Sequence, residues 1–226
     1  MKTSYFFLAI LAGVSLLAFQ HAVQDAPALA LFVRFFGLAA FFLLSAALMI
    51  GPAAVLWPKH FANLIEARRS VGVSAFVFLV PHFFLTISMY FKWNFTPVFG
   101  LPQLLAGLVA GIIVLALALT STDWAARTLG NNWKWLHRLV YLAFLLSLYH
   151  GIVQIQKFGL DKAGGMNLAQ VAVLAVAGVA VILQVAGFIT QRKRVAAAKA
   201  QANAAAPPAQ AQPQQQAQNP QQGQSG

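Results

Sequence analysis

The chain has 226 residues, of which 60% are hydrophobic and 8% are charged. Soluble domains contain roughly 45–50% apolar and about 25% charged residues, so the composition excludes an ordinary soluble protein and indicates an integral membrane protein. The net charge of +11 does not indicate nucleic-acid binding, because membrane proteins concentrate basic residues at the cytoplasmic ends of their spans. The chain has no cysteine, which excludes disulfides, thiolate metal sites and covalent c-type haem attachment.

Six apolar runs follow one another along the chain, each to be compared with the roughly 20 residues that a helical membrane span needs. Helices are expected because the interior of a bilayer offers no hydrogen-bond partner to an open backbone. The sequence therefore predicts an all-α membrane protein, a transmembrane bundle of six helices. The runs cover residues 5–19, 28–57, 71–91, 101–121, 136–156 and 168–190.

The first run has two interpretations. Lys2, the apolar segment 5–19 and the small-residue stretch A-P-A-L-A after Asp25 are also typical of a cleaved signal peptide, which would leave five helices. Both interpretations give the later five helices the same orientation. We therefore expect a first helix or signal peptide with its outer loop at 1–27 and a core membrane domain at 28–194.

The end of the chain has a different composition. Residues 195–226 are mostly Ala, Gln, Pro and Asn, with Lys199 as the last charge. Such a segment cannot bury a hydrophobic core. We expect a disordered tail that serves as a linker or a solubilising extension.

The distribution of Lys and Arg predicts the orientation. With the N-terminus inside, the cytoplasmic segments contain eleven of the 15 basic residues, and this excess predicts a multi-pass protein of the bacterial inner membrane with a cytoplasmic C-terminus. The eleven are Lys2, Lys59, Arg68, Arg69, Arg127, Lys134, Arg138, Arg192, Lys193, Arg194 and Lys199.

A short segment connects the fourth and fifth spans. It reads T-S-T-D-W-A-A-R-T-L-G, with Thr122 or Asp123 as a candidate N-cap and Gly130 as a candidate C′ residue. This pattern predicts a short helix at the cytoplasmic interface.

Two of the five histidines lie inside predicted spans. His82 stands about 18 Å above the cytoplasmic boundary of its span, and His150 stands about 20 Å above its own, at 1.5 Å per helical residue. Two histidines at one depth on facing helices are what an iron with two axial imidazole ligands requires. The alternative is hydrogen bonding between helices, to Ser, Thr or backbone. His21 and His60 are more simply interfacial polar residues.

Other candidate binding residues lie at two depths. His137 begins the helix that contains His150, and Arg68 and Arg69 reach the matching level on the third run. They could serve haem propionates, a flavin phosphate or anionic membrane lipid. Arg34, inside the second run, either snorkels to lipid headgroups or pairs with a propionate. Gly107 and Gly111 form a small-residue face for close approach of a helix or a flat macrocycle, and plain helix packing is the simpler interpretation.

Three segments resemble the ferric-reductase-like transmembrane family. They are R-R-S-V-G-V-S-A-F-V-F-L-V-P-H from Arg68, L-A-L-A-L-T-S-T from Leu115 and L-G-N-N-W-K-W-L-H-R-L-V-Y from Leu129, and the resemblance covers about residues 34–156. It implies a b-type cytochrome with one or two haems b, in which His82, His137 and His150 are the haem and metal ligands. The nearest branch of the family passes electrons to a periplasmic molybdopterin reductase that repairs methionine sulfoxide.

The chain departs from the larger members of this family in two ways. Those members carry two histidines on each of two helices, whereas here Arg69 stands thirteen residues before His82 and Phe95 thirteen residues after it. They also carry flavin and nicotinamide domains, and this sequence has no G-x-G-x-x-G motif. We expect electrons to come from a cytoplasmic flavin reductase, with FMN as a candidate cofactor, or from the quinone pool.

The sequence thus predicts an electron-transfer subunit of an oxidoreductase system rather than a complete enzyme. Two alternatives stay open. One is a component of a ferric or cupric reductase, which would hand electrons to a metal chelate. The other is a non-redox transporter or assembly factor whose histidines only make hydrogen bonds between helices.

Overall fold

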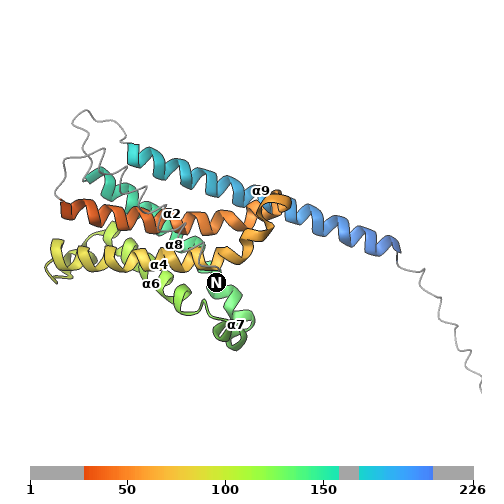
Figure 1. Cartoon of the computed structure of the whole chain (residues 1–226), viewed down its shortest axis with the longest axis horizontal. Helices are drawn as coiled ribbons and strands as arrows, with labels where there is room; N and C mark the ends of the chain where they lie inside the picture. Colours follow the sequence, from red (N-terminus) through yellow and green to blue (C-terminus); the bar gives the residue numbers. More distant parts are fainter. Residues whose placement is uncertain (1–27, 158–167, 206–226) are drawn as a thin grey trace, which may run out of the picture. The chain divides into compact units, whose positions relative to one another are not determined.

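The computed structural model describes residues 28–157 and 168–205, and within these ranges the chain is helical apart from short connections (Figure 1). Among the described residues, five helices are long and apolar enough to cross a membrane. They are α2 (Ala28–Leu56), α4 (Ile65–Leu85), α6 (Pro102–Leu119), α8 (Asn131–Lys157) and α9 (Leu168–Ala205). This confirms an all-α, multi-pass membrane fold, while the first apolar run and His21 lie outside the described residues.

Short elements connect the long helices. The helix α3 (Pro58–Phe61) and the 3₁₀ turn η1 (Ala62–Leu64) join α2 to α4, and the π-helix η2 (Thr86–Tyr90) prolongs α4. The helix α5 (Thr96–Gly100) precedes α6. His60, for which the sequence predicts an interfacial position, lies exposed on α3.

The interfacial helix predicted between the fourth and fifth spans is α7 (Asp123–Leu129). The side chain of Thr122 accepts a hydrogen bond of 3.1 Å from the backbone N–H of Ala125, so Thr122 rather than Asp123 is the N-cap. Gly130 ends the helix with a φ of +52°, a conformation that glycine adopts without steric cost. Local sequence therefore determines both ends of α7.

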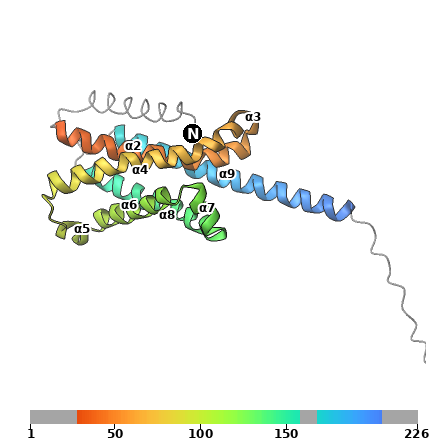
Figure 2. The ribbon, with the colours of Figure 1, turned by 60° about the horizontal axis from the view of Figure 1, so that its bottom comes forward.

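The helices of the membrane domain form two closely packed pairs. α2 lies along α4, and α6 lies along α8, whereas contacts between the two pairs are fewer (Figure 2). Small residues allow this packing, since Ala75 of α4 and Ala143 of α8 are almost fully buried. The rings of Phe41 and Phe144 stack between the pairs, with centroids 5.6 Å apart.

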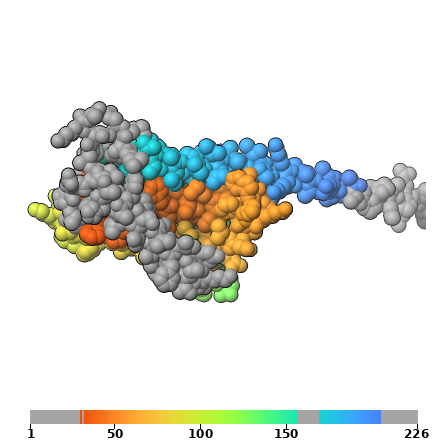
Figure 3. Space-filling view, turned by 45° about the horizontal axis from the view of Figure 1, so that its top comes forward, coloured from red at the N-terminus to blue at the C-terminus, as the bar shows by residue number. Residues whose placement is uncertain are grey.

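The helix α9 packs against α2 through residues that precede 191 (Figure 3). The Gln184 amide donates a hydrogen bond of 2.8 Å to the Leu48 carbonyl, and Gly187 faces Pro52. Many large apolar side chains remain exposed on the spans, among them Val77, Ile112 and Ile182. In a lipid bilayer such surfaces face hydrocarbon, so their exposure is consistent with a membrane-embedded bundle.

The helix α9 continues through Ala205, so residues 195–205 are helical, although we expected disorder from residue 195 onward. The reason is local, because this segment is rich in alanine, the residue with the highest helix propensity. Residues 206–226 lie outside the described residues. From residue 191 onward the described part of α9 belongs to a separate unit, and its residues 191–204 are exposed.

Candidate functional site

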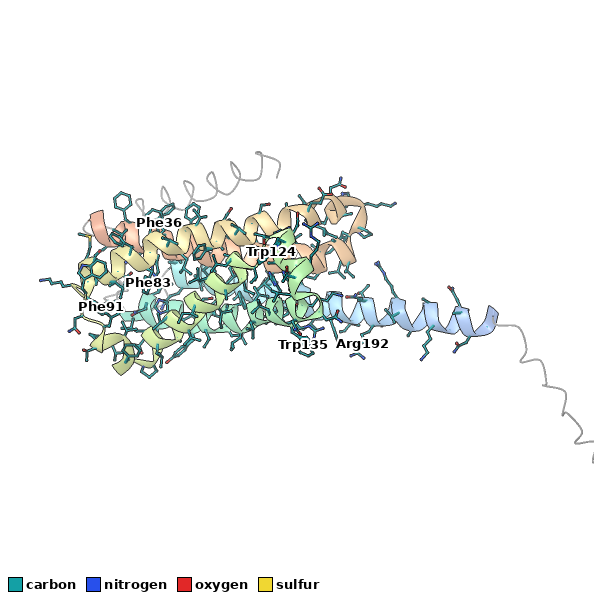
Figure 4. The ribbon with its side chains drawn as sticks, turned by 90° about the horizontal axis from the view of Figure 1, so that it is seen from below. Phe36, Phe83, Phe91, Trp124, Trp135 and Arg192 are labelled. Atoms are coloured by element: carbon teal, nitrogen blue, oxygen red, sulfur yellow. The ribbon has the colours of Figure 1, made fainter. Side chains whose placement is uncertain are left out.

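His82 of α4 and His150 of α8 face each other inside the bundle. Their ring centroids are 6.2 Å apart and their planes are nearly perpendicular, at 85°. One histidine comes from each helix pair, so the two rings meet where the pairs adjoin. The predicted equal depth of the two histidines is confirmed. Aromatic residues mark the two ends of the domain, with Phe83 and Phe91 at one end and Trp124 and Trp135 at the other (Figure 4).

The imidazole of His82 rests on the backbone of α2. Its Nδ1 is 2.9 Å from the Val33 carbonyl oxygen, and Gly37 follows four residues later. A Cβ atom added at Gly37 would lie 2.8 Å from both Nδ1 and Cε1 of the ring. The ring therefore occupies space that a side chain at residue 37 would fill.

The imidazole of His150 rests on α6 in the same way. Its Nδ1 is 2.8 Å from the Gln103 carbonyl oxygen, and Gly107 follows four residues later. A Cβ atom at Gly107 would lie 2.6 Å from Nδ1. We call each such pair, an accepting carbonyl and a glycine four residues later, a glycine notch.

This finding changes the interpretation of the α6 glycines. Gly107 admits the His150 ring, whereas a Cβ at Gly111 would make an ordinary contact of 3.8 Å with Leu79. The sequence did not single out Gly37, although a glycine inside the apolar α2 run was a visible signal. What the sequence lacked was the identity of the side chain that approaches each glycine.

The hydrogen bonds fix the tautomer of both rings. A carbonyl oxygen only accepts, so Nδ1 carries the hydrogen in His82 and in His150, and each Nε2 keeps its lone pair. Within residues 28–157 and 168–205, no hydrogen bond engages Nε2 of either ring. The interhelical hydrogen bonding considered as an alternative is therefore real, but it uses only one nitrogen of each ring.

The spacing of the two rings suits a metal ion between them. Two imidazoles that bind one ion from opposite sides, each through a bond of about 2 Å, place their ring centres roughly 6 Å apart. The observed 6.2 Å agrees with this value. A ring N–H held by a backbone carbonyl is also the usual second contact of a metal-binding histidine. Among the described residues, no cluster of three or more His, Cys, Asp or Glu could hold a metal, so further donors would come from a ligand.

The structure contains a third glycine notch, also on α2, which holds an arginine. The Nε atom of Arg68 donates a hydrogen bond of 3.1 Å to the Ala47 carbonyl, and a Cβ at Gly51, four residues later, would lie 3.2 Å from Nη1. Arg68 precedes His82 by fourteen residues, nearly four helical turns, which returns to the same face of α4. Arg68, and not Arg69, thus lies on the same face of α4 as His82, and like His82 it occupies a glycine notch of α2.

Arg69 points to a different neighbour. It donates to the Ser121 carbonyl and to the Asp123 carboxylate, so it links α4 to the N-terminus of α7. Both side chains of this ion pair are exposed, at 41% and 80%. The Arg69 guanidinium, through its hydrogen bond and its charge, lowers the pKa of the Asp123 carboxyl below its ordinary value, and Arg127 adds to the effect.

His137 lies apart from the His82–His150 pair. Its Nδ1 is 3.1 Å from the Trp133 carbonyl of its own helix, and its Nε2 is 3.5 Å from the Ser121 hydroxyl. That hydroxyl donates to the Leu117 carbonyl. At this level, therefore, the hydrogen bond to the α6 carbonyl comes from a residue just after the end of α6, and not from a histidine of α8. Arg34 follows Val33 on α2 and is partly buried, one residue beyond the carbonyl that His82 contacts.

Comparison with known proteins gives a family and several relatives. The family model described as "Ferric reductase like transmembrane component" matches residues 36–148, half of the chain. That range includes Gly37, His82, Gly107 and His137 and ends two residues before His150. No solved structure matches the chain.

The curated relatives include three proteins named "Protein-methionine-sulfoxide reductase heme-binding subunit MsrQ". The one from Agrobacterium fabrum is 29% identical over 161 residues, which are 70% of this chain and 69% of the relative. Those from Brucella ovis and Brucella canis are each 30% identical over 100 residues, which are 42% of this chain and 46% of the relative. The chain thus matches less than half the length of the Brucella relatives. The resemblance inferred from the sequence motifs is confirmed.

Proposed function

Because the chain belongs to the ferric-reductase-like transmembrane family, we propose that it is a haem-binding electron-transfer subunit of a methionine sulfoxide reductase system. The observation that carries this proposal is the His82–His150 pair, whose ring centroids lie 6.2 Å apart. Both rings offer an Nε2 lone pair, and both are oriented through Nδ1 by a helix backbone. The names of the relatives identify the system in which such a subunit works.

In this proposal His82 and His150 would hold a haem b through their Nε2 atoms. The haem supplies one-electron redox chemistry, and the protein supplies ligands, orientation and environment. The haem would bring four nitrogen donors of its own, so the two histidines would complete the set of iron ligands. A haem held by two protein histidines would leave the iron no position for oxygen or substrate, which would favour electron transfer over oxygen activation.

The residues at the second depth belong to a second redox site. His137 offers one imidazole there, and Arg68 offers a guanidinium held on α2. A guanidinium suits a carboxylate or phosphate group, so Arg68 would bind a propionate of a second haem b or the phosphate of FMN. Arg69 extends the same basic region, and Arg34 is a candidate propionate partner at the His82 level.

The direction of electron flow follows from the proposed orientation. Eleven of the 15 Lys and Arg residues face the cytoplasm when α9 ends there, in agreement with the positive-inside rule. Electrons would enter from a cytoplasmic flavin reductase or from quinol near His137. They would leave near His82 and His150 to a periplasmic molybdopterin reductase of the MsrP type.

The test is a reduced-minus-oxidised visible spectrum of the purified full chain in detergent, with haem quantified per chain. We expect a six-coordinate b-type spectrum. His60, exposed on α3, provides a matched control, because His60→Ala should leave the spectrum unchanged. A colourless preparation from haem-replete cells contradicts the proposal and returns the histidines to a structural role in a transporter or assembly factor.

The family description favours a second candidate, a ferric or cupric reductase component. The same histidine pair would serve it, so the site alone does not separate the two. The discriminating measurement is reoxidation of the dithionite-reduced protein by a ferric chelate, by a cupric salt or by a purified periplasmic methionine sulfoxide reductase. Fast reoxidation only by the reductase favours the first function, and fast reoxidation only by a metal favours the second.

A further inference from the structure

We propose that Gly37 and Gly107 are the positioning residues of the His82–His150 site. Each glycine opens the surface of a helix so that the opposing imidazole reaches a backbone carbonyl, and together they fix both the tautomer and the angle of the two rings. This inference rests on the proposed haem-binding function and deepens it.

The steric argument is the same on both helices. A Cβ at Gly37 would stand 2.8 Å from the His82 ring, and one at Gly107 would stand 2.6 Å from the His150 ring. Contacts this short do not occur for real Cβ atoms. Both imidazoles are tethered on rigid helices, and interiors packed this closely transmit strain instead of absorbing it. With any other residue at 37 or 107, the ring must leave the carbonyl.

The hydrogen-bond argument gives the glycines their chemical role. Val33 and Gln103 each stand four residues before a glycine, so each carbonyl lies beneath the space that the missing side chain leaves. The bonds of 2.9 Å and 2.8 Å keep hydrogen on Nδ1 and direct Nε2 away from the carbonyl. Such second contacts fix the orientation of a ligating histidine and raise its basicity.

The angular argument predicts a spectroscopic property. Since each ring is held against the neighbouring helix that carries its notch, the angle between the ring planes, 85°, is set by the two notches and not by the iron. In a ferric haem with two imidazole ligands, perpendicular ligand planes give a low-spin signal with one very large g value, whereas parallel planes give a well-resolved rhombic signal.

Two other helical glycines provide controls, Gly111 on the same helix as Gly107 and Gly72 on α4, the helix that carries His82. A Cβ at Gly111 of α6 would meet Leu79 at 3.8 Å, and one at Gly72 of α4 would meet Ala47 at 3.9 Å, both ordinary contacts. The loss of a helical glycine is therefore matched between test and control variants, and for Gly107 and Gly111 the helix is the same. Only the contact with an imidazole differs.

The experiment compares Gly37→Ala and Gly107→Ala with Gly72→Ala and Gly111→Ala in the full chain, made in haem-replete cells. Haem per chain, the ferric EPR spectrum and the midpoint potential are measured. We expect the control variants to match the unmodified protein. We expect the two test variants to bind haem about 10–100-fold more weakly, as is typical when a second contact of a ligating histidine is lost, or to give altered EPR spectra and potentials.

The unmodified protein provides a test that does not depend on variant folding. Its ferric EPR spectrum should show the strongly anisotropic signal of perpendicular ligand planes, and a rhombic signal overturns the proposal. Unchanged haem content, spectrum and potential in both test variants also overturn it. If the unmodified protein binds no haem, the proposed function itself fails; if it binds haem and the test variants match it, only the role of the glycines fails.

Discussion

The ring of His137 stacks on the indole of Trp133, one helical turn earlier on α8, with centroids 4.0 Å apart and 28° between the planes. Trp133 is held in turn by a hydrogen bond of 2.9 Å from its Nε1 to the Thr120 carbonyl. This local arrangement makes His137 independent of the His82–His150 pair. The two sites therefore have separable ligand sets, which mutagenesis can test.

We predict that His137→Ala leaves the haem held by His82 and His150 in place. None of the contacts of those two rings involves His137, so the six-coordinate visible spectrum should persist. If a second haem is bound at His137, the haem content per chain should fall to half that of the unmodified protein. Loss of all haem on changing His137 alone contradicts the assignment.

Replacement of His82 or His150 should abolish the six-coordinate spectrum. His82→Ala and His150→Ala each remove one of two axial ligands, and the remaining histidine cannot fill both axial positions of the iron. Added imidazole should partly restore the low-spin spectrum of either variant, since it can occupy the space that the ring leaves. A low-spin spectrum that persists in both variants without added imidazole would show that other residues bind the iron.

Much of this arrangement was predictable from the sequence, and the reason is geometric. Helical rise alone places His82 and His150 at one depth, because each residue advances a helix by a fixed distance. The ends of α7 were also predictable, since Thr122 and Gly130 act through neighbouring residues. Both predictions needed only short-range information.

The glycine notches were not predictable in this way. The partner of Gly37 is His82, forty-five residues away on another helix, and no local pattern joins them. The sequence likewise placed Arg68 and Arg69 together at the second level, whereas the shared face of α4 and the notch at Ala47 and Gly51 select Arg68. Which side chain approaches a helix depends on how two helices pack, and only the structure supplies that.

The cap of α7 gives a prediction about local stability. Thr122→Ala removes the side-chain oxygen that accepts from the Ala125 N–H, and the loss of such a cap costs about 1 kcal/mol. Thr122→Ser keeps an equivalent oxygen and should restore the stability. Hydrogen exchange of the α7 amides measures the effect, and equal protection in the two variants would show that the cap is unimportant here.

The Arg69–Asp123 ion pair predicts a pH dependence confined to acid. The pKa of Asp123 is lowered by Arg69, so the folded state favours the ionised carboxyl. The contribution of the pair is thus fully present above the ordinary pKa of an aspartate, about 3.9, and is lost as the pH falls through the lower folded value. Both groups are exposed, so the contribution should be small and weaker in high salt.

The measurement for this pair is the thermal stability of the full chain compared with Asp123→Asn. The difference between the two proteins should stay constant from about pH 7 to about pH 5 and shrink only below the ordinary aspartate pKa. A difference that already declines near neutral pH would mean that another titrating group controls the contact between α4 and α7.

The contact between α9 and α2 gives the last prediction. A Cβ at Gly187 would lie 2.6 Å from Cβ of Pro52 and 3.0 Å from its Cα, whereas a Cβ at Gly178 of the same helix meets nothing within 4 Å. Pro52 lies inside α2 and its rigid ring cannot move aside, so Gly187→Ala must push the helices apart. Overpacking of this kind costs roughly 1–3 kcal/mol, whereas Gly178→Ala should be neutral or slightly stabilising because alanine favours helix. Thermal unfolding in detergent compares the two variants, and equal melting temperatures would mean that α9 does not pack on α2 at Gly187.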